Sequence, residues 1–219
     1  MITRGVYSAT CSILDDDYSL NVEATINHAA SSIKNGLHGV IFFGSTGQSQ
    51  LIDLNSKKDL ISKIASHKFR RQFFLGTGVN SLQETVDLIK YGMEAYYKGN
   101  TEEGVYNFYK HIISQVPKVR IILYNFEKLS SFLFTPNFVK KLVASFPKNI
   151  IGVKDSSYNL YEKLKIPNFL IYPGSEAKLF KGLELGCAGT ISAVTQITHS
   201  LARKVFDDFE NKTPQTKNE

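Results

Sequence analysis

The sequence has no apolar run long enough to cross a membrane. No stretch of about 18 consecutive apolar residues occurs in it, and a membrane-spanning helix needs about 20. The first ten residues, MITRGVYSAT, lack the apolar core of a secretory signal peptide. We therefore expect a cytoplasmic protein without a membrane partner.

Cysteine is scarce, and the common phosphate-binding glycine motifs are absent. Cys11 and Cys187 lie far apart, with no CxxC pair and no Cys/His spacing typical of zinc ligands. Neither a disulfide framework nor a zinc site is indicated. The chain contains no GxGxxG and no GxxxxGK[ST] sequence, so the usual dinucleotide and nucleotide fingerprints are missing.

Charge is moderate and scattered. The formal net charge is +6, and the basic residues are spread over segments such as NSKKDL, KFRRQF and FVKKLV. Solvated helix faces explain this pattern better than a nucleic-acid surface, which needs clustered charge with interleaved aromatic residues. We expect no nucleic-acid partner, and a mildly positive surface that favours small anionic substrates.

Short apolar runs alternate with longer amphipathic stretches. The predicted strands lie within residues 5–11, 39–47, 72–78, 120–126, 149–157, 168–174 and 188–194. The predicted helices are Val22–Lys34, Ser56–Ser66, Leu82–Glu94, Thr101–Gln115, Thr135–Ser145, Ala177–Leu185 and Ser200–Phe209. This alternation predicts an α/β fold of parallel strands joined by crossover helices, either doubly wound or a barrel.

Capping residues support these helix boundaries. Asn55 or Ser56 can cap the second helix, and Ser81 can cap the third with Glu84 three residues later. Thr135 precedes a proline in the first turn of its helix.

Polar or small residues follow almost every predicted strand: GSTG, GTG, YN, KDSS, PGSE and IS. A (β/α)8 barrel gathers its active site in this way, whereas a doubly wound sheet concentrates such residues at one switch point. We therefore predict a (β/α)8 TIM barrel over residues 1–210, followed by a polar tail at residues 211–219.

A lysine stands where a buried strand ends. Lys154 directly follows the apolar run 150–153, and small polar residues come after it. Partial desolvation there favours the neutral amine, a nucleophile that can form a Schiff base with a carbonyl compound. The alternative from these residues alone is a lysine whose ammonium group reaches into water.

Other strand ends can complete a site around this lysine. In GSTG, Gly44 and Gly47 permit close backbone approach to a ligand, while Ser45 and Thr46 can bind a carboxylate. Tyr124, in YN, can transfer protons. The alternatives are a plain turn for GSTG and a packing residue for the tyrosine.

Two later strand ends extend this set. PGSE combines a flexible glycine with Glu176, and in GTIS Gly189 and Ile191 can line the floor of a small site.

The order of GSTG, YN, GVKDSS, GSE and GxxGxIS resembles the dihydrodipicolinate synthase/N-acetylneuraminate lyase family of pyruvate-dependent class I aldolases, from Gly5 to about Phe209. The resemblance implies that Lys154 condenses with the keto group of pyruvate and that Tyr124 relays protons. Ser45 and Thr46 match the carboxylate-binding pair, of which the second hydrogen-bonds the tyrosine. Gly189 and Ile191 match positions that line the pyruvate pocket. No metal or organic cofactor is implied.

The sequence departs from the family at the substrate side. Glu127 stands where the family usually has proline. Leu129 stands where members that condense pyruvate with aspartate semialdehyde carry an arginine, although Lys128 lies next to it. These departures argue against dihydrodipicolinate synthesis.

Two further departures concern completeness. The fourth barrel strand is missing or replaced between Glu94 and Thr101, where Tyr96 and Tyr97 resemble loop tyrosines of the family. The C-terminal helical segment of the family is absent. The predicted barrel is therefore incomplete.

We predict a Schiff-base aldolase or lyase that acts on pyruvate and an aldehyde, or on a 2-keto acid. A 2-keto-3-deoxy sugar acid or sialic acid is favoured over aspartate semialdehyde. The alternatives are a catalytically weakened keto-acid-binding homologue or a non-functional truncated aldolase. A homo-oligomer is possible within the family pattern.

Overall fold

Parallel strands form two sheets in the computed structural model, which describes residues 2–77, 83–86, 101–130 and 132–214. The first sheet has the order β3-β2-β1-β7 and the second the order β4-β5-β6. The described strands are β1 (Gly5–Ala9), β2 (Gly39–Phe42), β3 (Phe73–Leu75), β4 (Ile121–Asn125), β5 (Ile150–Asp155), β6 (Leu170–Pro173) and β7 (Gly189–Ser192). Each lies within a predicted apolar run, and every pairing between them is parallel.

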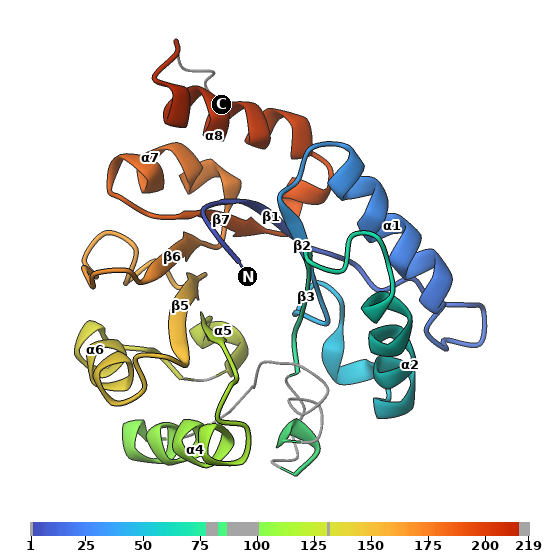
Figure 1. Ribbon diagram of the computed structural model, residues 1–219, viewed down its shortest axis with the longest axis horizontal. Coiled ribbons are helices and arrows are strands. Elements are labelled where there is room, and N and C mark those ends of the chain that lie inside the picture. Colours follow the sequence, from blue (N-terminus) through green and yellow to red (C-terminus); the bar gives the residue numbers. More distant parts are fainter. Residues whose placement is uncertain (1, 78–82, 87–100, 131, 215–219) are drawn as a thin grey trace.

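The longer helices lie outside the strands, which surround the centre of the molecule (Figure 1). They are α1 (Val22–Lys34), α2 (Leu54–Ala65), α4 (Glu102–Gln115), α6 (Pro136–Ser145), α7 (Leu179–Glu184) and α8 (His199–Asn211). The short helices are α5 (Glu127–Ser130) and the 3-10 turns η1 (Ser49–Leu51), η2 (Glu176–Lys178) and η3 (Val194–Gln196). Residues 83–86 are also helical.

Helix starts follow their capping residues. Thr101 and Thr135 accept hydrogen bonds from the backbone N–H groups of Gly104 and Phe138, as expected for N-caps. The prediction for α2 is wrong: the cap is Asp53, whose carboxylate accepts from the N–H groups of Asn55 and Ser56. Because an ionised carboxylate satisfies two free N–H groups at once, the helix begins at Leu54.

One interior cluster receives a side chain from each described strand. Its members are Ile2, Tyr7, Ile41, Phe74, Ile122, Ile151, Leu170, Tyr172, Ala188 and Ile191. The rings of Tyr7 and Tyr172 meet edge to face, with their centroids 5.8 Å apart. Both sheets therefore face a common interior, as in a barrel.

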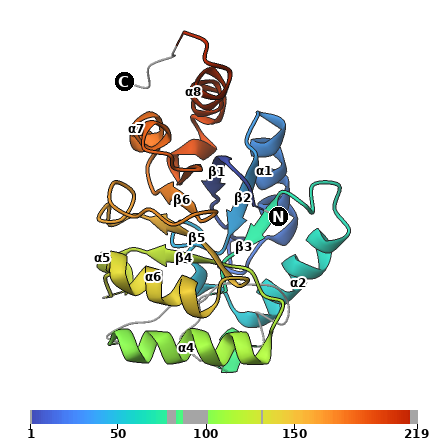
Figure 2. The ribbon, with the colours of Figure 1, turned by 60° about the vertical axis from the view of Figure 1, so that its left-hand side comes forward.

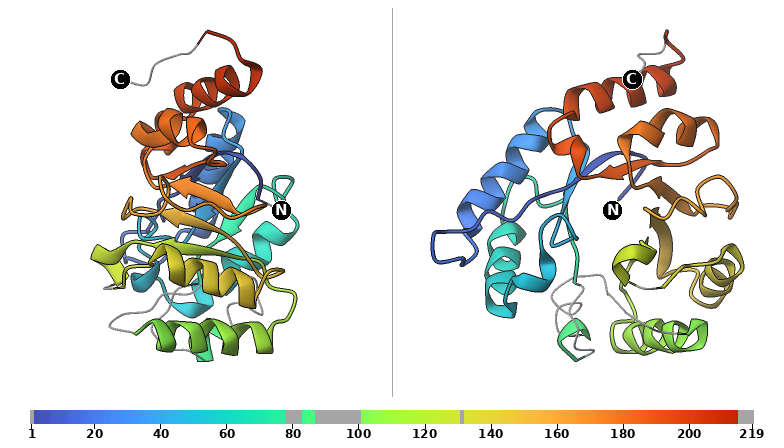
Figure 3. Two further views of the ribbon diagram at one scale, coloured as in Figure 1. Left: turned by 90° about the vertical axis from the view of Figure 1, so that its left-hand side faces the viewer. Right: turned by 180° about the vertical axis from the view of Figure 1, so that it is seen from behind.

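The outer faces of the sheets form two separate cores with the helices. Helices α4 and α6 lie side by side (Figure 2) and pack with β4 and β5. Tyr106 of α4 contacts the Phe146 ring at 5.6 Å between centroids. The second core joins α1, α2 and α8 to β1, β2 and β3, and these helices keep their outer position when seen from behind (Figure 3).

The two sheets meet along β6 and β7. The Ala188 N–H donates to the Ile171 carbonyl at 2.8 Å, and the Thr190 hydroxyl donates to the Pro173 carbonyl at 2.7 Å. On the other side, the segment between β3 and β4 includes residues 78–82 and 87–100, which lie outside the described part of the chain. The predicted loss of the fourth strand falls there, so the completeness of the barrel stays a prediction.

Candidate active site

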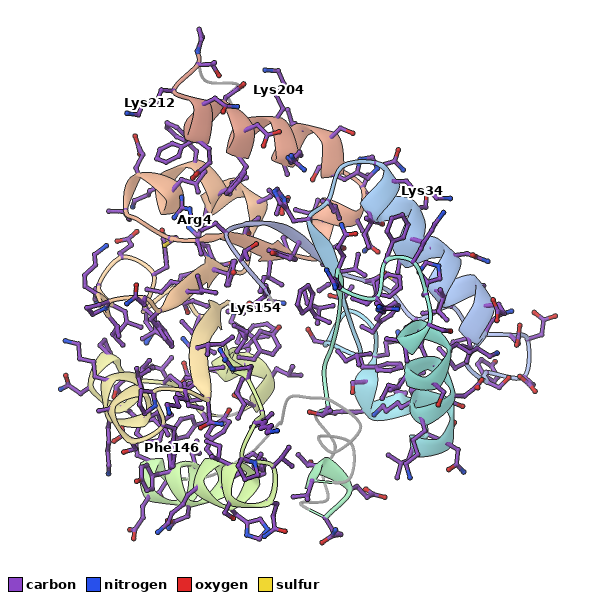
Figure 4. The ribbon with its side chains drawn as sticks, in the orientation of Figure 1. Arg4, Lys34, Phe146, Lys154, Lys204 and Lys212 are labelled. Atoms are coloured by element: carbon purple, nitrogen blue, oxygen red, sulfur yellow. The ribbon has the colours of Figure 1, made fainter. Side chains whose placement is uncertain are left out.

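Lys154 and Tyr124 are neighbours across the β4–β5 pair. The parallel register places Tyr124 opposite Lys154, and the Lys154 Nζ lies 4.5 Å from the centroid of the Tyr124 ring. Figure 4 shows Lys154 on the side of β5 that faces the centre of the molecule. The lysine is half-buried rather than fully exposed, so the amine and the phenol share one pocket.

The loop after β2 reaches this pair from the other sheet. The Ser45 hydroxyl and the Tyr124 hydroxyl are 3.1 Å apart and share a hydrogen bond. The resemblance implies that Thr46 hydrogen-bonds Tyr124; Thr46 lines the same pocket, and its hydrogen bond to the tyrosine stays a prediction. The backbone of Phe43 is left-handed, with a φ of 54°, which turns the chain directly after β2 and brings Ser45 to the tyrosine.

These groups line a pocket of about 520 Å³. Its lining residues are Ser45, Thr46, Tyr124, Phe126, Glu127, Lys128, Lys154, Ser156, Ser157, Tyr158, Gly174 and Ala193. The lining comes from segments that follow β2, β4, β5, β6 and β7. The carboxyl ends of the strands therefore gather at one site, as the barrel prediction requires.

A buried polar network holds the β4 and β5 ends together, and sequence reasoning missed it. The Asp155 carboxylate is fully buried and accepts a hydrogen bond from the Asn125 amide at 2.8 Å. It also accepts from the backbone N–H groups of Tyr158, Leu160 and Tyr161, each at 2.9 Å. The available signal was the polar residue that ends each apolar run, directly after Tyr124 and Lys154.

Asn125 extends the network to the segment before α6. Its amide also donates to Asn159 at 2.7 Å, and its oxygen accepts from the Phe134 N–H at 3.1 Å. Asn159 in turn donates to the Phe134 carbonyl at 2.8 Å. This network fixes the backbone on both sides of Lys154 and Tyr124.

The predicted glycines divide into different roles. A Cβ added to Gly47 would lie 3.0 Å from the Thr10 carbonyl oxygen, so this glycine serves loop packing, whereas one added to Gly44 would meet open space. Neither lines the pocket. Gly174, by contrast, does line it, and an added Cβ would lie 2.1 Å from the Ser156 hydroxyl.

The structure does not bring Gly189 or Ile191 to the pocket wall. Gly189 begins β7 opposite Gly5, at the end of the sheet away from the site, and Ile191 is buried in the interior cluster. The last residue of that strand, Ser192, donates a hydrogen bond to Glu176 at 2.5 Å. Tyr96 and Tyr97 lie outside the described residues.

The described part of the chain contains neither a cluster of metal ligands nor a membrane-spanning helix. Within residues 2–77, 83–86, 101–130 and 132–214, no group of three His, Cys, Asp or Glu side chains can hold a metal ion. In the same residues, no helix has the length and apolar character needed to cross a bilayer.

Comparison with known proteins places the chain in a family. The sequence profile of the Dihydrodipicolinate synthetase family matches residues 2–218. An uncharacterized DapA-like lyase of Chloroflexus aurantiacus is 27% identical over 94% of this chain and 75% of its own length. A 2-dehydro-3-deoxy-D-gluconate/2-dehydro-3-deoxy-phosphogluconate aldolase of Picrophilus torridus is 27% identical over 77% of this chain and 67% of its own length.

A solved structure of the same family has a similar fold. YagE, a prophage protein of the dihydrodipicolinic acid synthase family from E. coli K12, was solved in complex with pyruvate. It matches with a TM-score of 0.87 at 26% identity, over 97% of this chain and 76% of YagE.

Proposed function

Because the chain belongs to the Dihydrodipicolinate synthetase family, we propose that it is a class I aldolase or lyase that uses Lys154 as its Schiff-base lysine. One observation carries the proposal. The Lys154 amine lies against the ring of Tyr124, whose hydroxyl is hydrogen-bonded to Ser45 in the same pocket. A nucleophile, a proton-transfer group and a hydroxyl donor thus meet where the family's fold puts its chemistry.

The proposed reaction begins with attack of the neutral Lys154 amine on the keto carbon of a 2-keto acid. The resulting carbinolamine loses water and becomes an iminium ion. The iminium accepts the electron pair released when a proton leaves the adjacent methyl carbon, which gives an enamine. The enamine carbon attacks an aldehyde to form a carbon–carbon bond, and hydrolysis frees the lysine. Cleavage is the same sequence in reverse, and the lysine itself supplies the electron sink without a cofactor.

Tyr124 and the GSTG loop have separate proposed roles. The Tyr124 hydroxyl, 3.1 Å from Ser45, moves protons to and from the carbinolamine oxygen. Ser45 and Thr46 both line the pocket, and their hydroxyl and N–H groups bind the carboxylate of the keto acid.

For the substrate, we propose a 2-keto-3-deoxy sugar acid or a sialic acid in preference to aspartate semialdehyde. Leu129 offers no charge to a second carboxylate. The pocket wall instead offers the hydroxyls of Ser156, Ser157 and Tyr158 beside Glu127, which suit a substrate with several hydroxyl groups. The name of the Picrophilus torridus relative points to the same class of compound.

Borohydride trapping tests the proposal. The protein is incubated with pyruvate, reduced with borohydride and weighed, and we expect one reduced pyruvate adduct that maps to Lys154. Lys154→Ala should abolish the adduct. Lys128→Ala is the matched control, because Lys128 lines the same pocket from α5 and should leave trapping unchanged. Absence of an adduct in folded wild-type protein would rule the proposal out.

A second experiment separates an enzyme from a keto-acid-binding homologue. Both would form the adduct, but only the enzyme would release pyruvate from 2-keto-3-deoxygluconate or N-acetylneuraminate. Pyruvate release is followed with a lactate dehydrogenase coupled assay.

A further inference from the structure

Tyr158 occupies the pocket wall in a backbone conformation that tyrosine rarely adopts. Its φ is 58°, in the left-handed region that favours glycine. The residue lies four positions after Lys154, lines the pocket and remains 39% exposed. A strained residue that persists at a site is a reason to ask what its side chain contributes.

Hydrogen bonds to the buried Asp155 carboxylate fix the loop that carries Tyr158. The backbone N–H of Tyr158 donates to one oxygen of the buried Asp155 carboxylate at 2.9 Å, while Leu160 and Tyr161 donate to the other oxygen. The left-handed turn is therefore held by hydrogen bonds to a group next to Lys154. The position of the Tyr158 ring is set by the same strand end that sets the amine.

The Tyr158 ring is also held from one side. The Lys178 ammonium lies 4.8 Å from the ring centroid, within the range of a cation–π contact. The Tyr161 ring meets it at 83° with 6.3 Å between centroids. With backbone and ring both fixed, the phenol is a preorganised group on the pocket wall.

The phenol is a hydrogen-bond donor near neutral pH. Burial raises the pKa of Tyr158, a side-chain hydrogen bond with Ser175 opposes this increase, and the charges of Asp155, Glu176 and Tyr124 add smaller increases. The hydroxyl therefore keeps its proton. Tyr124 and Tyr158 both line the pocket that contains Lys154, so a substrate bound to the lysine lies in a space that both residues border.

We propose that Tyr158 is a specificity-determining residue that donates a hydrogen bond to the part of the 2-keto acid beyond its fourth carbon, and so selects polyhydroxylated substrates. This inference rests on the proposed function. Among its polar neighbours in the wall, Ser157 already accepts a hydrogen bond from the Glu127 N–H at 2.9 Å, and the Ser156 hydroxyl packs against Gly174. Tyr158 has the longest side chain of the three, and it lines the pocket while it stays exposed.

Trapping with two keto acids of different length tests the inference. Wild type, Tyr158→Phe and Tyr158→Gly are reduced with borohydride in the presence of pyruvate or 2-keto-3-deoxygluconate, and the half-saturating concentration is measured for each. We expect Tyr158→Phe to trap pyruvate like the wild type. Its half-saturating concentration for 2-keto-3-deoxygluconate should rise about three- to tenfold, the loss of one hydrogen bond.

Tyr158→Gly separates site from scaffold. We expect this variant to raise the melting temperature, because glycine adopts positive φ without strain. It should weaken the binding of 2-keto-3-deoxygluconate at least as much as Tyr158→Phe does. Tyr161→Phe is the matched control, because Tyr161 is buried, packs on Tyr158 and donates a hydrogen bond to Glu162. This variant should leave the ratio of the two half-saturating concentrations unchanged.

The outcomes are distinguishable. A wild-type protein that traps pyruvate but not 2-keto-3-deoxygluconate overturns the role of Tyr158 and leaves the Schiff base intact. The role of Tyr158 is also overturned if Tyr158→Phe leaves the ratio of the two half-saturating concentrations unchanged. No adduct with either compound overturns the proposed function itself, and the inference with it.

Discussion

Asp155 offers a test of how the scaffold controls the site. Asp155→Asn changes one carboxylate oxygen to an NH₂ group and leaves the shape of the side chain unchanged. In the wild type each oxygen accepts two hydrogen bonds: Oδ1 from the Asn125 amide and the Tyr158 N–H, Oδ2 from the Leu160 and Tyr161 N–H groups. Whichever oxygen is replaced, the two N–H groups that donate to it in the wild type then face the NH₂ group of the new amide.

The magnitude follows from that geometry. A hydrogen bond to a charged group contributes about 1.5–3 kcal/mol to stability, and a buried donor left without a partner adds its own desolvation cost. Loss of two such bonds predicts a decrease of about 3–6 kcal/mol in the free energy of unfolding. Since domains are stable by about 5–15 kcal/mol, the variant should be close to unfolding at 37 °C.

Urea titration of wild type and Asp155→Asn at neutral pH measures this difference. Asp16→Asn is the control, because Asp16 is exposed on the loop before α1 and its change should cost less than about 0.5 kcal/mol. Asp155→Asn should also slow pyruvate trapping under conditions where it is still folded, since Lys154 is the adjacent residue. A loss of less than about 1 kcal/mol would refute the view that this carboxylate holds the loop.

Three further predictions concern chemistry, specificity and charge. Tyr124→Phe should lower turnover by about 10²–10⁴-fold, the contribution of a positioned proton-transfer group, with the equilibrium yield of pyruvate adduct retained; wild-type turnover would make Tyr124 a packing residue. With pyruvate as the other substrate, aspartate semialdehyde should be used at least about 100-fold less efficiently than the aldehyde that gives 2-keto-3-deoxygluconate, because a carboxylate near Leu129 lacks a charged partner. Efficient use of aspartate semialdehyde would show that Lys128 supplies this charged partner. Burial lowers the pKa of Lys57 to about 8 against 10.5 in the unfolded chain, opposed by Asp53 and Glu84. The unfolded chain therefore binds more protons between these values, and stability rises with pH there. Lys57→Met should remove that rise and stabilise the protein at pH 7 by roughly 3–4 kcal/mol, at about 1.4 kcal/mol per pKa unit; a pH-independent difference would contradict this.

Secondary structure was readable from the sequence because its signals are local. The short apolar runs located every described strand, and the predicted Val22–Lys34 helix matches α1 at both ends. The error at α2 is instructive: Asp53, Asn55 and Ser56 are all good N-caps. Only the structure shows that the carboxylate of the first accepts from the N–H groups of the other two.

The site was readable only in part, because contacts between distant segments leave no local signal. Lys154 and Tyr124 stand out as polar residues at strand ends. The hydrogen bond between Ser45 and Tyr124 depends on the turn at Phe43, whose positive φ is unusual for an aromatic residue. Asp155 is equally inconspicuous in sequence, since its four donors come from a strand end and from a loop that turns back on it.

Gly189 shows how a correct pattern can have another cause. The glycine was predicted to line the substrate site because it matches a family position that lines the pyruvate pocket. In the structure it is paired with Gly5, and an added Cβ would lie 1.9 Å from the Gly5 carbonyl oxygen. Its φ of 141° also disfavours other residues. The two glycines let β1 and β7 approach each other, and this contact continues the first sheet to the strand that meets β6. In the structure Gly189 therefore belongs to the pairing of β1 with β7, and the lining of the Lys154 pocket does not include it.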